Sequence, residues 1–207
     1  MDYDLSKITP DIRYLNDVKS VLHDKKFSEI TGNFELYFMY RGLEEKEGLR
    51  YDITVIPEKM LGDEFIKTKG HYHVGSYGEL YTVLDGTAIY LMQKRKPDSD
   101  NEIEDVYFVK AKKGDVVIIP QYYGHITINP SESENLKMVN WVSKDCKSDY
   151  SLYEKFQGAC YFFTKGPASA KGSGEGTWIK NENYKSIPEL REEKPTKYIP
   201  EDLSFLK

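Results

Sequence analysis

Short segments rich in β-branched and aromatic residues follow one another through the middle of the chain, and they constrain the fold more than any other feature. Turn-forming residues separate many of them, and Asp85-Gly86 between two such segments is a strong hairpin signal. Short strands with regular turn punctuation predict an all-β sandwich or barrel. The expected strands are 34–41, 50–56, 79–84, 88–93, 106–110, 116–119, 125–129 and 137–142.

The segments on either side of this region have a different character. Residues 1–33 are polar, with a helix-like spacing of apolar side chains, and residues 151–207 predict one short helix over 151–159. The glycine-rich stretch 166–176 predicts a flexible surface loop, and the charged tail that follows is expected to cross the surface or contact a partner subunit. We expect one domain, 1–207, in which a barrel of residues 34–150 carries short helical or irregular extensions at both ends.

Composition excludes several classes of function. The 207 residues carry 29 Lys and Arg against 34 Asp and Glu, whereas binding of duplex nucleic acid requires a cationic surface. No apolar run approaches the roughly 20 residues of a membrane span, and the N-terminus has no signal-peptide pattern. We therefore expect a cytoplasmic protein without nucleic-acid or membrane partners. Cys146 and Cys160 are expected to be free thiols.

Three histidines and one glutamate form the pattern that points to a functional site. His71 and His73 are two residues apart, so on a strand both side chains face the same side. Glu79 follows a turn-forming stretch, and His125 lies much later in the chain. Three imidazoles and a carboxylate suit a divalent metal ion, although a His-x-His pair also occurs by chance as two structural residues. His23 lies in the polar N-terminal segment and is interpreted as a surface residue.

The spacing around these residues resembles the two sequence motifs of the cupin superfamily. The first motif corresponds to Gly70-His71-Tyr72-His73, Glu79 and Gly86, and the second to Gly114, Pro120, His125 and Asn129. The interval from His73 to Glu79 is longer than in most cupins, and Tyr122 stands where cupins usually have glycine. The resemblance implies a double-stranded, jelly-roll-like β-barrel that holds a metal ion through His71, His73, Glu79 and His125.

A finer resemblance narrows the family. The run Thr68-Lys69-Gly70-His71-Tyr72-His73, together with Glu79-Leu80-Tyr81, resembles the metal-dependent, cupin-type glucose-6-phosphate isomerases of archaea and some bacteria. The likeness extends over about residues 34–150. One departure is Ser148, where close relatives are expected to have a histidine before Asp-Tyr. The chain therefore lacks the histidine to which the resemblance would assign a role in ring opening or proton transfer.

Members of that family interconvert glucose 6-phosphate and fructose 6-phosphate, in glycolysis and gluconeogenesis. The resemblance implies a homodimer with one divalent ion per subunit, Fe²⁺ being the expected ion and Mn²⁺, Ni²⁺, Co²⁺ or Zn²⁺ the alternatives. Glu79 is then the candidate catalytic base for moving hydrogen between C1 and C2. Because a tightly bound ligand is a poor base, either its ligation loosens when substrate binds or a hydride shift replaces the enediolate route.

The resemblance also implies a binding site for the sugar phosphate. Thr54, Thr68 and the backbone of Gly70 would bind the phosphate, with Lys67 and Lys69 either adding positive charge or facing solvent. Thr68 and His71 are three positions apart, so both can line one pocket only if the strand bends between them, and Gly70 is the residue that best permits a bend.

Two tyrosines and two other functions complete the hypotheses. Tyr37 and Tyr81 either orient the sugar hydroxyls or are core residues of the barrel. Three histidines and a glutamate also suit a metal-dependent oxygenase or decarboxylase, and a non-catalytic sugar-binding cupin is a further alternative. The Thr-Lys-Gly run favours the isomerase over the oxygenase.

Overall fold

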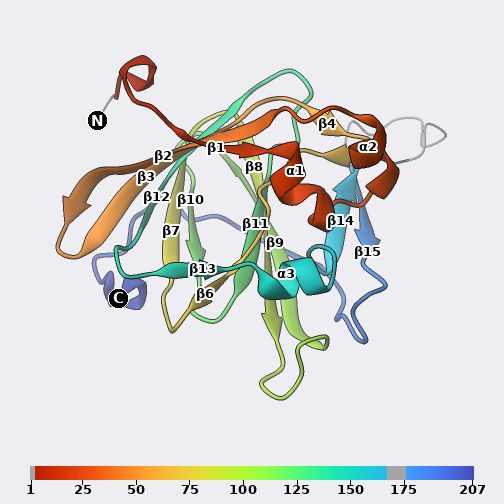
Figure 1. Ribbon diagram of the computed structural model, residues 1–207. Helices are drawn as coiled ribbons and strands as arrows, with labels where there is room; N and C mark the ends of the chain where they lie inside the picture. Colours follow the sequence, from red (N-terminus) through yellow and green to blue (C-terminus); the bar gives the residue numbers. More distant parts are fainter. Residues whose placement is uncertain (1–2, 167–175) are drawn as a thin grey trace.

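The computed structural model describes residues 3–166 and 176–207, and strands make up most of its regular structure (Figure 1). The all-β class predicted from the sequence is confirmed. The helical elements are η1 (Leu5–Lys7), α1 (Leu15–Val18), η2 (Lys19–Val21), α2 (Lys25–Ile30), α3 (Ser151–Lys155) and η3 (Ser204–Leu206). The strands are β1 (Asp11–Tyr14), β2 (Glu35–Lys46), β3 (Leu49–Ile56), β4 (Met60–Leu61), β5 (Glu64–Phe65), β6 (Tyr72–Val74), β7 (Glu79–Asp85), β8 (Thr87–Arg95), β9 (Ile103–Lys112), β10 (Val116–Ile119), β11 (Gly124–Ile128), β12 (Leu136–Ser143), β13 (Lys147–Asp149), β14 (Tyr161–Thr164), β15 (Thr177–Lys180) and β16 (Arg191–Glu193).

Two larger sheets pack against each other to form the barrel. One has the strand order β1-β2-β3-β12-β7-β10 and the other the order β11-β8-β9-β16. Val83 of the first sheet and Leu91 and Ile126 of the second belong to one buried apolar cluster between them. An isolated bridge between His71 and His125 joins the chain before β6 to the edge strand β11. The double-stranded barrel expected from the cupin resemblance is therefore confirmed.

Each strand expected from the sequence is present, but one expected hairpin is wrong. The chain at Asp85-Gly86 passes from β7 in one sheet to β8 in the other, and the two strands do not pair. Gly86 has a φ of +75°, and a Cβ there would lie 2.4 Å from the carbonyl oxygen of Asn135. The Asp-Gly signal thus marks a crossover between sheets. The tight hairpin lies instead between β2 and β3, where Glu47 and Gly48 both have positive φ.

The terminal extensions contribute more strands than the sequence suggested. β1 pairs with the edge strand β2, and β14, β15 and β16 all lie beyond residue 150, so strand formation is not limited to 34–150. The expected helix over 151–159 is the shorter α3. The tail lies across its own barrel, where Thr196 bridges to Val116 and Leu206 is buried. Most of the expected loop, 167–175, lies outside the described residues, and the single domain 1–207 stays a prediction.

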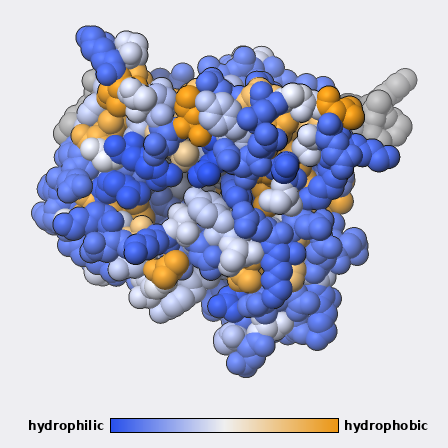
Figure 2. Space-filling view, viewed as in Figure 1, coloured by the Kyte–Doolittle hydropathy of each residue, from blue (hydrophilic) through white to orange (hydrophobic). Residues whose placement is uncertain are grey.

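The surface and the thiols agree with the composition. The face seen in Figure 2 is mostly hydrophilic, with hydrophobic residues in small groups. In the described part of the chain, no helix combines the length and the apolar character needed to cross a bilayer. Cys146 and Cys160 are both free, as expected.

Candidate functional site

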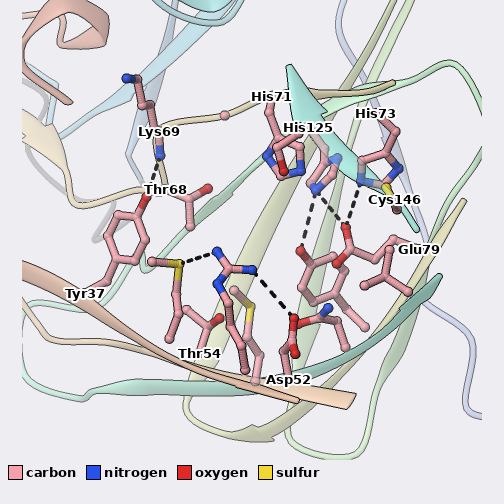
Figure 3. Close-up of a pocket in the computed structure, with 18 of the residues that line it drawn as sticks. Tyr37, Asp52, Thr54, Thr68, Lys69, His71, His73, Glu79, His125 and Cys146 are labelled. Carbon is pink, nitrogen blue, oxygen red and sulfur yellow. Dashed lines mark hydrogen bonds and ion pairs between the residues drawn. The ribbon is translucent and has the colours of Figure 1, made fainter. Parts of the chain in front are cut away.

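Alternate side chains of neighbouring strands form the wall of a pocket on one face of the larger sheet (Figure 3). Because successive side chains of a strand point to opposite faces, residues two apart share a face. The strand register places Asp52 opposite Asn140, and Asn140 opposite Tyr81, in one row across the wall. The wall consists of Tyr37, Met39 and Arg41 on β2, Arg50, Asp52 and Thr54 on β3, Met138, Asn140 and Val142 on β12, and Glu79 and Tyr81 on β7.

The opposite side of the pocket is formed by the irregular segment around Gly70. Gly70 has a φ of +82°, and a Cβ there would lie 2.4 Å from Cγ2 of Ile126 and 2.6 Å from Cε1 of Tyr153. The chain therefore bends at this glycine, as the sequence predicts, and both Thr68 and His71 line the pocket.

The four candidate metal ligands converge at one end of the pocket. The ligand atoms of His71, His73, Glu79 and His125 all lie within 4.8 Å of one another. Nε2 of His73 and Nε2 of His125 lie 3.3 and 3.2 Å from Oε2 of Glu79. Nδ1 of His73 lies 2.9 Å from the carbonyl oxygen of Tyr77, so in the neutral ring Nδ1 carries the proton and Nε2 is free to coordinate.

The free atoms of this cluster fit a cation. Oε2 of Glu79 is buried, yet it makes no well-directed hydrogen bond to any described residue. A carboxylate oxygen that faces two imidazole nitrogens without such a bond is the arrangement expected around a shared ion. Three imidazoles and one carboxylate are also the donor set of many first-row metal centres. The cluster is therefore a candidate divalent-metal site.

Burial and mutual contacts set the charges of the cluster. Burial, and after it the charges of His125 and His73, holds the pKa of His71 well below its usual range, and burial likewise lowers the pKa of His125. Burial opposes protonation of His73, but its contacts with Cys146 and Glu79 raise the pKa of His73 to about 10. Burial would raise the pKa of Glu79, but its contacts with His125 and His73 hold that pKa well below the usual range.

Hydrogen-bond donors gather at the other end of the pocket. Oγ1 of Thr68 accepts a hydrogen bond from the backbone N–H of Thr127, which leaves its own hydroxyl proton available. The hydroxyl of Tyr37 accepts from the backbone N–H of Lys69 at 3.2 Å. Thr54 is buried and lines the same region. The structure therefore brings together all the substrate-binding candidates of the sequence analysis: Thr54, Thr68, Gly70, Tyr37 and Tyr81.

Lys67 does not belong to this site. Its ammonium group is buried, forms an ion pair with Glu64 and donates to the carbonyl oxygen of Val21 at 2.9 Å. Lys67 therefore neither faces solvent nor adds charge to the pocket. Lys69 does line the pocket, where its ammonium group pairs with Glu154.

A group of charged wall residues was missed by the sequence analysis. Arg41 donates through Nε to Asp11 at 3.1 Å, and its Nη1 lies 3.7 Å from Asp52. Asp52 also accepts from Nε of Arg50 at 2.9 Å and from the backbone N–H of Gly42 at 2.8 Å. A signal for them was present in the sequence, because residues an even number of positions apart on a strand share a face. By that rule Arg41 shares a face with Tyr37, and Arg50 and Asp52 share one with Thr54.

Ser148 occupies the position where the family resemblance led us to expect a histidine. It lies opposite His73 in the pairing of β13 with β6, and it lines the pocket. The departure therefore concerns a residue of the site itself, and the chain has a hydroxyl there in place of an imidazole.

Comparison with known proteins identifies the family of this chain. The sequence profile of the family described as glucose-6-phosphate isomerase matches residues 12–185. The chain belongs to this family. A glucose-6-phosphate isomerase of Thermococcus litoralis is 34% identical over 128 residues, which cover 58% of this chain and 63% of that protein. A second, from Thermococcus onnurineus, is 30% identical over 152 residues, which cover 70% of this chain and 75% of that protein.

Among solved structures, similarity in fold is weaker. An oxalate decarboxylase of Bacillus subtilis is 16% identical, with a TM-score of 0.39 over 54% of this chain and 27% of that protein. The segment aligned with the T. litoralis isomerase spans less than two thirds of that protein.

Proposed function

We propose that the protein is a metal-dependent glucose-6-phosphate isomerase, which interconverts glucose 6-phosphate and fructose 6-phosphate in the cytoplasm for glycolysis and gluconeogenesis. One observation carries the proposal: a single pocket has a three-histidine, one-glutamate cluster at one end and hydroxyl and amide donors at the other. A pocket with these two different ends suits a substrate that has a reacting carbonyl at one end and a phosphate at the other. A homodimer is proposed from the family resemblance alone.

His71, His73, Glu79 and His125 are the proposed metal ligands, with Fe²⁺ as the proposed ion and Mn²⁺, Ni²⁺, Co²⁺ or Zn²⁺ as alternatives. When bound, the ion would supply Lewis acidity that makes the hydrogen next to the sugar carbonyl easier to remove. His71 and His125 are held in the neutral form that coordinates metals.

Glu79 is the proposed catalytic residue. Contacts with His125 and His73 hold its pKa well below the usual range, so its carboxylate is ionised at neutral pH and is a weak base while those contacts last. It would take hydrogen from one of the two reacting carbons and return it to the other, provided that its contact with the ion loosens in the substrate complex. If that contact persists, a hydride shift replaces this step. The Tyr81 hydroxyl, 3.5 Å from Nε2 of His125, is placed to orient the reacting end of the sugar.

The phosphate is proposed to bind at the donor end of the pocket. The hydroxyl groups of Thr54 and Thr68 and the backbone N–H of Gly70 line this end, and within residues 3–166 and 176–207 that N–H has no backbone partner. Tyr37 would add a further donor. Hydroxyl and amide donors in a buried region suit a phosphate dianion, whereas the ammonium group of Lys69 is already paired with Glu154.

A coupled assay tests the proposal. Purified protein loaded with Fe²⁺ or Mn²⁺ is given fructose 6-phosphate, and glucose 6-phosphate is measured through the NADPH that glucose-6-phosphate dehydrogenase forms. Turnover that disappears with EDTA and returns with added metal supports the isomerase. Oxygen uptake with no glucose 6-phosphate would indicate a cupin oxygenase, and sugar-phosphate binding with no turnover would indicate a non-catalytic binding protein.

A further inference from the structure

Asn140 stands out in the pocket because its side chain lacks partners. The residue is 6% exposed and lines the pocket wall on β12. Within the described residues, 3–166 and 176–207, its carboxamide makes no hydrogen bond to another residue. A carboxamide has two donors and an acceptor, and those of Asn140 border the pocket, where a ligand can bind them.

The other buried asparagines of this chain show what a structural role looks like. The side chain of Asn129 donates to the carbonyl oxygens of Ile56 and Glu134 at 3.0 and 2.9 Å. The side chain of Asn181 donates to the carbonyl oxygens of Phe156 and Ala159, both at 2.9 Å. Each of these amides connects two separate backbone carbonyl groups by hydrogen bonds, whereas the Asn140 amide makes no such connection.

The polar groups next to Asn140 in the row make their hydrogen bonds to other partners. Asp52, on one side of the row, accepts from Arg50 and from the backbone of Gly42. Tyr81, on the other side, directs its hydroxyl toward His125. The carboxamide therefore faces the pocket with its hydrogen-bonding capacity unused.

The position of Asn140 indicates what it would bind. On one side Asn140 pairs with Asp52 of β3, and Thr54 lies two residues further along that strand. On the other side it pairs with Tyr81 of β7, and Glu79 lies two residues before Tyr81. With about 6.7 Å per two residues and about 4.8 Å between strands, Thr54 and Glu79 each lie about 8 Å from Asn140 in diagonally opposite directions. Asn140 is thus midway between the proposed phosphate end and the proposed reacting end.

We propose that Asn140 is a specificity-determining residue, whose carboxamide hydrogen-bonds the hydroxyl groups in the middle of the sugar chain. The inference rests on the proposed function and extends it to carbons that do not react. An amide is suited to this task because it can donate to one hydroxyl and accept from its neighbour. A site that pairs with substrate hydroxyls also rejects analogues that lack them.

Two non-reacting ligands test the proposal in the metal-loaded full chain. Glucitol 6-phosphate has the middle hydroxyls but no carbonyl, and n-hexyl phosphate has neither. Isothermal titration calorimetry should show that Asn140→Leu weakens glucitol 6-phosphate about tenfold while n-hexyl phosphate changes less than twofold. Lys137→Ala, which has the opposite parity on β12, should leave both affinities unchanged.

Thermal unfolding separates this role from a structural one. Because Asn140 has no partner to lose, Asn140→Leu should leave Tm unchanged or raise it, whereas Asn181→Leu should lower Tm clearly. If Asn140→Leu lowers both ligand affinities equally, leaves both unchanged, or lowers Tm as Asn181→Leu does, the proposal is wrong. If the wild-type chain binds neither phosphate, the failure is that of the proposed function, and the inference that rests on it falls too.

Discussion

Replacing Gly70 by alanine tests whether the bend before His71 shapes the pocket. The new Cβ would lie 2.4 Å from Ile126 and 2.6 Å from Tyr153, and both side chains are fully buried, so neither can move freely. Overpacking of this kind costs about 1–3 kcal/mol, and a positive φ costs an alanine about 1 kcal/mol more. We expect Gly70→Ala to lower the free energy of unfolding by about 2–4 kcal/mol.

Gly48 provides a matched control for that substitution. Its φ of +81° equals that of Gly70 to within a degree, but a Cβ there would meet nothing within 4 Å. Gly48→Ala should therefore lower the free energy of unfolding by only about 1 kcal/mol, which is the cost of a positive φ for alanine. Urea unfolding of both variants measures the difference, since the linear extrapolation gives each free energy. Equal losses for the two variants would refute the reasoning, because they would mean that Ile126 and Tyr153 do not confine Gly70.

Three further predictions concern the site, the buried ion pair and the tail. Glu79→Gln should reduce kcat at least about 100-fold with little change in Tm, and full turnover in this variant would exclude a catalytic role. Lys67→Met should destabilise by about 3–5 kcal/mol because it leaves the Glu64 carboxylate buried without its cation, and adding Glu64→Leu should recover much of that loss in urea unfolding. The hydrogen bond from Arg191 outweighs burial and lowers the pKa of Asp105, so this pair stabilises the fold above the ordinary aspartate pKa and is lost as pH falls below it. Asp105→Asn should therefore destabilise the protein most at pH 7 and progressively less as the pH falls below 3.8 through the lowered pKa, and an equal loss at every pH would contradict this assignment.

Where the signal was local, the sequence predicted the strands and grouped residues that the structure brings into one pocket. Alternating β-branched and aromatic residues placed every expected strand, because the pattern reflects burial of one strand face. The histidine spacing brought His71, His73 and His125 into one group, since a two-residue interval fixes a common face and the second motif supplies the facing strand. Thr68 and His71 are three positions apart and would point to opposite faces of a regular strand, so the sequence also predicted the bend that the structure has at Gly70.

The failures arose where long-range packing decides the outcome. Asp85-Gly86 is a local turn signal, but the larger sheet pairs β7 with β12 and β10, so the turn becomes a crossover. Lys67 was expected near the phosphate or in solvent, yet a glutamate three residues earlier and a carbonyl of the N-terminal segment enclose it. Neither partner is visible from strand periodicity. Arg41 was marked only by the two-residue period that it shares with Tyr37, and Asn140 was missed because its place in the pocket depends on the register of β12 with β3 and β7.

Metal stoichiometry tests the central claim most directly. The full-length chain and the variants His71→Ala, His73→Ala and His125→Ala are dialysed with Fe²⁺ or Mn²⁺ without oxygen, and bound metal is measured by mass spectrometry. Because the ligand atoms of the cluster lie within 4.8 Å of one another, we predict one tightly held ion per wild-type chain and loss of that ion in each variant that remains folded. A wild-type chain that retains no ion, or folded variants that retain it fully, would contradict the account.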